Sequence, residues 1–270
     1  MSKPEQISIG QLTTFLIDLD GVIYRGEELL PGADKFIAWL EANQKKYLFL
    51  TNNSFASETQ VIAKLKRLGI TVDKTHVLGA GQAAVQNIAR RFPAASVYVV
   101  GEPPLFDLVR EHQLTIANPD GHTANVVLVG LDRTFDYQKL KGAVIAVRSG
   151  ATFVAINRDP LLPVVGDLIP GCGAMVAAIE ASSEVQPEVI GKPQPMLLLE
   201  ALHSLGSQPE EAIMIGDTLG VDIRAGIAAS THTLLVLSGS TTRASLEKST
   251  LKPDYVYENI GAALEEILKH

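Results

Sequence analysis

Short apolar runs rich in β-branched residues alternate with longer amphipathic segments along almost the whole chain. Strands that alternate with helices in this way build a parallel sheet covered by helices, so the sequence predicts an α/β fold. The predicted strands are residues 14–17, 47–50, 97–100, 126–129, 153–156, 212–215, 233–237 and 255–257. The predicted helices are residues 33–43, 57–68, 82–91, 105–112, 138–149, 174–182, 195–205 and 261–268.

The composition is that of an ordinary water-soluble globular protein, with 270 residues, 46% hydrophobic and 20% charged. The net charge is −7 and the basic residues are scattered, so we expect no nucleic-acid partner. No apolar run approaches the roughly 18 residues that span a bilayer, and the first ten residues lack the apolar core of a secretory signal, so we expect no membrane association. The single cysteine, Cys172, excludes an internal disulfide and fits a reducing compartment, which predicts a cytoplasmic location.

An apolar run of strand character, residues 15–17, ends in two carboxylates, Asp18 and Asp20, followed by Gly21. Residues two apart on a strand point to the same side, so both carboxylates are expected together at the carboxyl end of the strand, where open α/β sheets bind ligands. Two such groups repel unless a cation or a shared proton relieves them. The pair therefore indicates a nucleophile, a proton-transfer group and a seat for a hard metal ion. The alternative is an Asp-rich turn.

The predicted strand at residues 47–50 switches just as abruptly to Thr51, Asn52 and Asn53. A hydroxyl, amides and backbone N–H groups before a helix make a phosphate cradle, although a plain polar turn with helix-capping residues has the same composition.

Two further strings share this design. Lys192 stands between a glycine and a proline after two β-branched residues, which suits a cation aimed at phosphoryl charge, although most lysines are merely solvated. Asp217 ends the strand at residues 212–215 and suits Mg²⁺, whereas Asp222 is equally well explained as an acid at a helix N-terminus. If the strands before all four strings lie side by side in one parallel sheet, the four sites meet at one edge.

With these strings in this order, the chain resembles the haloacid dehalogenase superfamily of phosphotransferases. The matching segments are residues 18–22, 51–54, 191–193 and 216–222. Their amino-acid sequences, together with that of residues 170–174, are most similar to those of the NagD-type branch of sugar, phosphoglycolate and p-nitrophenyl phosphatases. The resemblance covers essentially the whole chain. It implies a Rossmann-like parallel-sheet core with an inserted α/β cap of the C2 type.

The resemblance also implies roles for individual residues. Asp18 would attack the substrate phosphorus and form an aspartyl-phosphate. Asp20 would protonate the leaving oxygen and later activate water, while its backbone carbonyl binds Mg²⁺; a true dehalogenase needs no acid there. Asp217 would bind Mg²⁺ directly, and Asp222 would hold either the waters of the metal or Lys192. The predicted metal set is therefore Asp18, Asp20, Asp217 and Asp222.

Thr51, Asn52 and Asn53 would bind the phosphoryl oxygens, and Lys192 would neutralise their charge. The long segment after the second motif would be the cap, at residues 78–186, with the core formed by residues 1–77 and 187–270. Caps of this kind close over the site and often mediate dimers, so a homodimer is expected. Residues 166–173 and 186–187 are rich in Gly and Pro and are predicted loops or hinges.

Asn157, Arg158 and Asp159 end a cap strand in a polar turn and are candidate specificity residues. Arg158 suits a second anionic or hydroxyl-rich substrate group, although a surface arginine beside Asp159 explains it as well. The family pattern often lacks an arginine there.

The sequence thus predicts a Mg²⁺-dependent phosphatase of small phosphorylated metabolites, such as sugar phosphates, with p-nitrophenyl phosphate as a test substrate. Two other readings stay open. Gly79 and Gly81, followed by Ala84 and later by Glu102, imitate the dinucleotide turn of a nicotinamide-dependent oxidoreductase. The other is a catalytically inactive binding protein with the haloacid dehalogenase fold.

Overall fold

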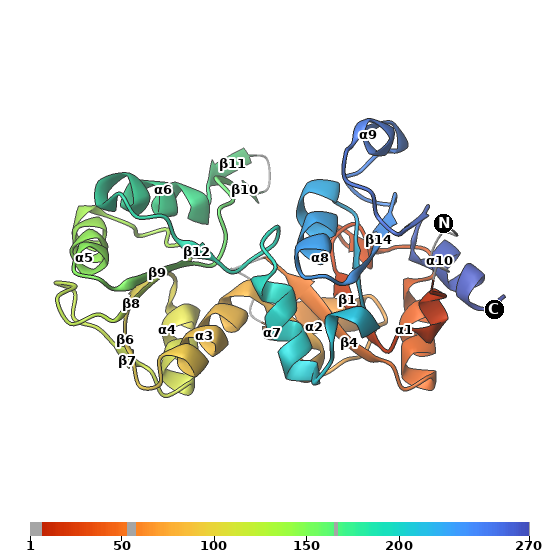
Figure 1. Cartoon of the computed structure of the whole chain (residues 1–270), viewed down its shortest axis with the longest axis horizontal. Coiled ribbons are helices and arrows are strands. Elements are labelled where there is room, and N and C mark those ends of the chain that lie inside the picture. The colour runs from red at the N-terminus through yellow and green to blue at the C-terminus, as the bar shows by residue number, and fades with distance from the viewer. Residues whose placement is uncertain (1–6, 53–57, 165–166, 270) are drawn as a thin grey trace, which may run out of the picture. The chain divides into compact units, whose positions relative to one another are not determined.

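The computed structural model describes residues 7–52, 58–164 and 167–269. The chain divides into two compact units. Unit 1 consists of Met1–Thr51, Glu58–Leu78 and Lys192–His270, and unit 2 of Asn52–Ser57 and Gly79–Gly191. Each unit contains a parallel sheet with helices packed on it (Figure 1).

The sheet of unit 1 has six strands in the order β15-β14-β13-β1-β4-β5. Their bounds are Tyr255–Tyr257 (β15), His232–Val236 (β14), Ala212–Gly216 (β13), Thr14–Asp18 (β1), Lys46–Thr51 (β4) and Val77–Gly79 (β5). The pairings from β15 through to β4 are parallel. Central strands of such a sheet are buried on both faces, which explains why β1 and β13 are continuous apolar runs with no exposed side chain between Phe15 and Ile17 or between Ile213 and Ile215.

Helices cover both faces of this sheet. In Figure 1, α7 and α8 lie on one side of β1, β4 and β14, and α1 and α10 lie on the other. The last two pack closely, since a Cβ on Gly32 would lie only 2.4 Å from the Cα of Gly261. The helices of unit 1 are Ala33–Ala42 (α1), Glu58–Arg67 (α2), Met196–Leu205 (α7), Arg224–Ala228 (α8), Arg243–Lys248 (α9) and Ile260–Ile267 (α10), with 3-10 turns at Ile9–Gln11, Lys74–His76 and Pro209–Glu211 and a π-helical turn at Leu219–Ile223.

Between β1 and β4 the chain forms one hairpin, with strands Tyr24–Arg25 (β2) and Glu28–Leu29 (β3), and then α1. Unit 1 therefore leaves no room for an insert at this point, as the spacing of the first two motifs predicts. The ring of Phe15 in β1 lies 5.8 Å from that of Trp39 in α1, edge to face, so this helix is anchored on the central strand.

Unit 2 contains a five-stranded sheet in the order β12-β9-β8-β6-β7, again parallel. Helices α3 and α4 cover one face, and α5 and α6 cover the other (Figure 1). The strands are Glu188–Val189 (β12), Thr152–Ala155 (β9), Val126–Val129 (β8), Ser96–Val100 (β6) and Thr115–Ile116 (β7), and the helices are Ala80–Arg91 (α3), Pro103–Glu111 (α4), Tyr137–Arg148 (α5) and Cys172–Ser183 (α6). A separate antiparallel hairpin joins Leu161–Val164 (β10) to Asp167–Pro170 (β11).

The predicted strands and helices are all present, with ends displaced by two residues or fewer, although Ser57 lies outside the described residues. The α/β fold is confirmed. No helix among the described residues combines the length and the apolar character that a bilayer crossing requires.

Two expectations were wrong. Residues 167–173 are not a loop, because β11 and the start of α6 occupy them. Pro170 is the last residue of its strand, where the missing N–H costs little, and Gly171 is needed because a Cβ would lie 2.4 Å from the carbonyl oxygen of Asp159. Moreover, β12, the strand before Lys192, pairs with β9 in unit 2 and not with the sheet that carries the other three motifs.

Candidate active site

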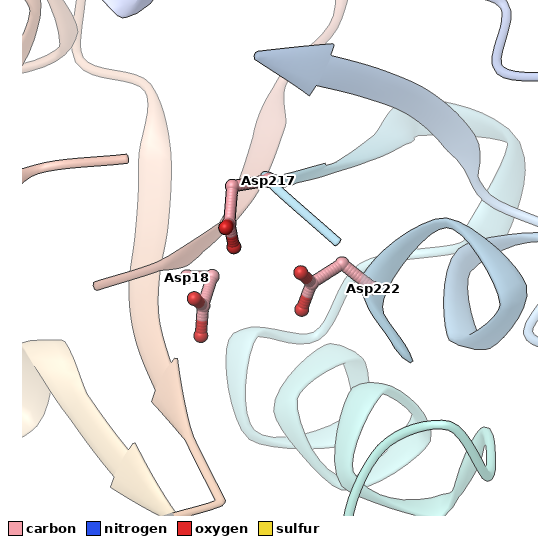
Figure 2. A group of neighbouring side chains, drawn as sticks. All are labelled: Asp18, Asp217 and Asp222. Atoms are coloured by element: carbon pink, nitrogen blue, oxygen red, sulfur yellow. The ribbon is translucent and has the colours of Figure 1, made fainter. Parts of the chain in front are cut away.

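Three carboxylates from unit 1 meet at the carboxyl end of the central strands. Asp18 is the last residue of β1, and Asp217 directly follows β13, which is paired with β1 through Ile17 and Ile215. Asp222 lies in the π-helical turn that follows. Figure 2 shows the three side chains facing one another, and their closest carboxylate oxygens all lie within 4.8 Å of each other.

Lys192 supplies the positive charge of this cluster. Its Nζ lies 2.5 Å from Oδ1 of Asp18 and 2.8 Å from Oδ1 of Asp222. The side chain is only 2% exposed. A buried ammonium is tolerated only with such partners, so this lysine is held by the two acids and is not a solvated surface group.

Burial and charge both act on the protonation of the cluster. Burial raises the pKa of the Asp18 carboxyl to about 7, against the attraction of Lys192, and the neighbouring Asp222 raises it further. Burial alone would lower the pKa of Lys192, but the two carboxylates outweigh it and hold the pKa above its usual value. Lys192 therefore stays charged, while an excess of negative charge makes the Asp18 carboxylate bind a proton, or another cation, more readily.

Backbone and hydroxyl donors fix the other two acids. Oδ2 of Asp222 accepts a hydrogen bond from the N–H of Thr218, at 3.0 Å. Asp217 accepts from the N–H of Ser240 at 2.5 Å through Oδ2, and from the hydroxyl of Thr218 at 3.2 Å through Oδ1. These donors set the directions of both side chains.

Three glycines make room for the acids. A Cβ on Gly216 would lie 2.1 Å from the Cβ of Asp222, and one on Gly239 would lie 2.1 Å from Oδ2 of Asp217. A Cβ on Gly21 would lie 2.6 Å from the Asp217 carboxyl carbon, and Gly21 also has a φ of +80°, a conformation that favours glycine. At these three positions the main chain lies so close to the acids that no side chain larger than that of glycine fits without a shift.

Asp20 is placed differently from the expectation. The strand ends at Asp18 and the chain bends at Leu19, so the same-side geometry of a strand does not extend to Asp20. Asp20 keeps substantial contact with solvent, its backbone pairs with Tyr24, and its carboxylate is not one of the three that cluster. Partial desolvation by the surrounding protein raises the pKa of Asp20, against the attraction of Lys64, and the charge of Asp217 acts in the same upward direction.

The predicted phosphate-binding residues belong to different units. Thr51 ends β4 in unit 1, next to β1, and Asp18 is paired with its neighbour Leu50. Asn52 belongs to unit 2, where its carbonyl oxygen accepts a hydrogen bond from Nδ2 of Asn157 at 3.1 Å. Asn53 lies outside the described residues.

The candidate specificity residues occupy the turn after β9 in unit 2. Asn157 is buried, and its Oδ1 accepts from the N–H of Asp159 at 3.1 Å, so its side chain fixes this turn. Arg158 forms an ion pair with Glu180 of α6. Its contact with a substrate stays a prediction.

The dinucleotide turn gains no support from the described residues. The strand–helix junction exists, but Gly79 has ordinary backbone angles with nothing within 4 Å of a built Cβ, and a Cβ on Gly81 would make an ordinary contact at 3.6 Å. Both oxygens of Glu102 already accept from Arg133, at 3.0 and 3.1 Å.

Sequence reasoning missed Thr218 and the loop that contains Ser240. The available signal was the same as for the other motifs: small polar residues follow the predicted strand at residues 233–237.

Known proteins place the chain in a family. Residues 15–115 match the haloacid dehalogenase-like hydrolase family, and residues 189–263 match the HAD-hydrolase-like family. The acid sugar phosphatase of Staphylococcus aureus is 35% identical over 259 residues, which cover 96% of this chain and 99% of that protein. A thermostable p-nitrophenylphosphatase from Bacillus stearothermophilus is 37% identical, with a TM-score of 0.85 over 93% of this chain and 97% of that one. NagD from E. coli K-12 is 27% identical, with a TM-score of 0.85 over 93% of this chain and 98% of its own. The chain belongs to the haloacid dehalogenase-like hydrolases, in their NagD-like phosphatase branch.

Proposed function

We propose that this phosphatase hydrolyses small phosphorylated metabolites with Mg²⁺ and an aspartyl-phosphate on Asp18. The environment of Asp18 supports this proposal most strongly. Its carboxylate ends the central strand, 2.5 Å from a buried lysine and among two further acids. A carboxylate held rigidly beside a cation is suited to attack a phosphorus atom whose oxygens need neutralising.

The donor set fits Mg²⁺. Three carboxylates face one ammonium group, so the cluster carries uncompensated negative charge, and carboxylate oxygens are the ligands that this ion prefers. Asp18, Asp217 and the backbone carbonyl of Asp20 would hold it, and the ion when bound would neutralise charge on the transferred phosphoryl group. Both oxygens of Asp222 already accept hydrogen bonds, from Lys192 and Thr218, which favours holding Lys192 over holding metal-bound water.

In the first step Asp18 attacks phosphorus while the bond from phosphorus to the leaving oxygen breaks. Asp20 gives its proton to that oxygen, which releases the alcohol. In the second step the Asp20 carboxylate takes a proton from water as the water oxygen bonds to phosphorus. The acyl phosphate bond then breaks, inorganic phosphate leaves, and Asp18 is restored.

Thr51 and Lys192 would bind phosphoryl oxygens in unit 1, and Asn52 and Asn53 remain predicted partners. Unit 2 would be the cap, with Asn157, Arg158 and Asp159 as candidate specificity residues. Similarity to an acid sugar phosphatase and to p-nitrophenylphosphatases supports sugar phosphates or related esters as substrates, with p-nitrophenyl phosphate as a reporter. We also propose a cytoplasmic location and a homodimer.

The test is Asp18→Asn, assayed with p-nitrophenyl phosphate and a panel of phosphorylated metabolites, with Mg²⁺ and with a chelator. We expect Mg²⁺-dependent turnover in the parent and none in the variant, with unchanged circular dichroism. Asp34→Asn, on the exposed start of α1, is the matched control and should keep parental activity.

Intact-mass spectrometry of Asp20→Asn after a brief exposure to p-nitrophenyl phosphate should then detect one added phosphoryl group, because this leaving group needs no proton while the water-activating base is gone. Full activity of Asp18→Asn would contradict the proposed nucleophile, and an inactive parent would favour a binding protein.

A further inference from the structure

The loop between β14 and α9 contacts Asp217 at three points. The N–H of Ser240 donates to its carboxylate at 2.5 Å, and the N–H of Thr241 donates to its carbonyl oxygen at 3.1 Å. At Gly239, a Cβ would lie 2.1 Å from Oδ2 of the same residue. A loop that approaches so closely fixes both the backbone and the side chain of Asp217.

The beginning of this loop contacts the turn that carries Asp20. The hydroxyl of Ser238 donates to the carbonyl oxygen of Gly21 at 2.7 Å, and the guanidinium of Arg25 donates to the carbonyl oxygen of Ser238. Gly21 directly follows Asp20, and its N–H bonds to the carbonyl of Tyr24 at 2.8 Å. Ser238 is therefore hydrogen-bonded to Gly21, the residue that follows Asp20.

The end of the loop contacts the turn that carries Asp222. Thr241 is only 6% exposed, and its Oγ1 accepts from the N–H of Leu219, the first residue of the π-helical turn, at 3.1 Å. One short segment, Ser238 to Thr241, thus contacts the chain at Asp217 and beside Asp20 and Asp222.

We propose that Ser238 and Thr241 are positioning residues of the active site: Thr241 holds the segment that joins Asp217, a proposed metal ligand, to Asp222, and Ser238 holds the turn that carries Asp20. This inference rests on the proposed function. Residues that orient metal ligands without touching the metal commonly change metal affinity by about 10- to 100-fold when altered. The two hydroxyls bond to different turns of the site, at Gly21 and at Leu219, so their losses should change different measured quantities.

Thr241→Val keeps the shape of the side chain and removes its hydroxyl. We expect the dissociation constant for Mg²⁺, measured by isothermal titration of the substrate-free protein, to rise about tenfold. Thr241→Ser should restore it, because the hydroxyl returns. The matched control is Thr231→Val, another buried threonine of unit 1, whose hydroxyl bonds to the carbonyl of Gly226 at 3.2 Å. It should bind Mg²⁺ like the parent.

Ser238→Ala should act through proton donation. An alkyl phosphate such as glycerol 2-phosphate needs a protonated leaving group, whereas p-nitrophenolate leaves as a stable anion. We expect kcat/KM to fall about tenfold for the alkyl ester and less than twofold for p-nitrophenyl phosphate, a fraction of the effect of losing a general acid. Ser204→Ala, which removes a hydroxyl bonded to the carbonyl of Glu200 in α7, should affect neither substrate.

Parental Mg²⁺ affinity in Thr241→Val, or equal losses on both esters in Ser238→Ala, would overturn the assignment of the corresponding residue. The proposed function fails separately. If Asp18→Asn stays active the chemistry is wrong, whereas an inactive Asp18→Asn with unaltered Thr241→Val refutes only the positioning role.

Discussion

Each unit has an aspartate–lysine ion pair at or just after the end of a parallel strand. In unit 1, Asp18 ends β1 and lies 2.5 Å from Nζ of Lys192. In unit 2, Asp132 comes shortly after β8 and lies 2.6 Å from Nζ of Lys139. Both aspartates are placed where α/β sheets bind ligands, so position alone does not distinguish them.

Charge balance does distinguish them. Asp132 accepts hydrogen bonds from the N–H and the hydroxyl of Thr134, at 2.9 and 2.7 Å, as well as from Lys139. One carboxylate meets one ammonium, and both of its oxygens accept hydrogen bonds. Lys192 instead serves two carboxylates, with Asp217 beside them. A cluster with more carboxylates than ammonium groups, as at Lys192, therefore indicates a site for a further cation, whereas a single ion pair, as at Lys139, does not.

Replacing each lysine should separate the two pairs most clearly. Lys192→Met removes the cation that, within residues 7–52, 58–164 and 167–269, pairs with the acids of the cluster, so we expect kcat/KM to fall at least about 100-fold, as for the loss of one charge-stabilising group. Lys139→Met should keep activity within about twofold of the parent by the same criterion. Steady-state assays with p-nitrophenyl phosphate measure kcat/KM for both variants. A comparable loss in the two would contradict the claim that only the Lys192 pair belongs to the active site.

Stability should respond in unit 2. Lys139→Met leaves a buried carboxylate without its charge partner, so we expect the free energy of unfolding to fall by about 2 kcal/mol, less than for a fully buried pair because Lys139 is partly exposed. Urea denaturation followed by circular dichroism measures it. An unchanged midpoint would mean that the Asp132 network does not stabilise the fold.

The burial of Asp18 also predicts a pH dependence for the metal-free protein. Burial raises the pKa of Asp18 from 3.8 to about 7, so the folded state holds this proton more tightly than the unfolded chain does. The resulting stabilisation is complete below about pH 4 and is lost as the pH rises through 7. In a chelator, Tm should therefore fall by a few degrees between pH 5 and pH 8. Asp18→Asn should flatten this slope; an equally steep slope in that variant would assign it to other groups.

The smallest effect is expected at Cys172, the first residue of α6 in unit 2. Burial raises the pKa of its thiol to about 12, so at pH 8 almost no thiolate exists in the folded protein. Iodoacetamide should label it only after denaturation, as mass spectrometry would show. Rapid labelling of the native protein would contradict the burial of this thiol.

Much of this arrangement follows from local sequence. Strand β8 is predicted residue for residue because Val126–Val129 is an uninterrupted β-branched and aliphatic run. The meeting of Asp18 and Asp217 follows from parallel topology, since β1 and β13 are neighbours. These features need only periodicity and the rule that ligands bind at the carboxyl ends of strands.

Other features depend on long-range contacts that no local pattern encodes. The strand before Lys192 looks like the others but pairs with β9, and the lysine reaches Asp18 although 174 positions separate them. Asp20 leaves the strand direction at a bend of one residue. Ser240 and Thr241 bond to Asp217 through backbone N–H groups, which every residue except proline carries. The small polar side chains after β14 therefore indicate a functional loop but do not encode these bonds.

Gly21, Gly216 and Gly239 have no functional group, yet each leaves space that a carboxylate of the cluster occupies. Mutational tolerance at these positions should therefore resemble that of the acids themselves. A substitution to alanine at any one of them displaces a carboxylate of the cluster even though all the aspartates are still present. The presence of the aspartates is therefore not enough to identify a relative as active. The three glycines must be present as well.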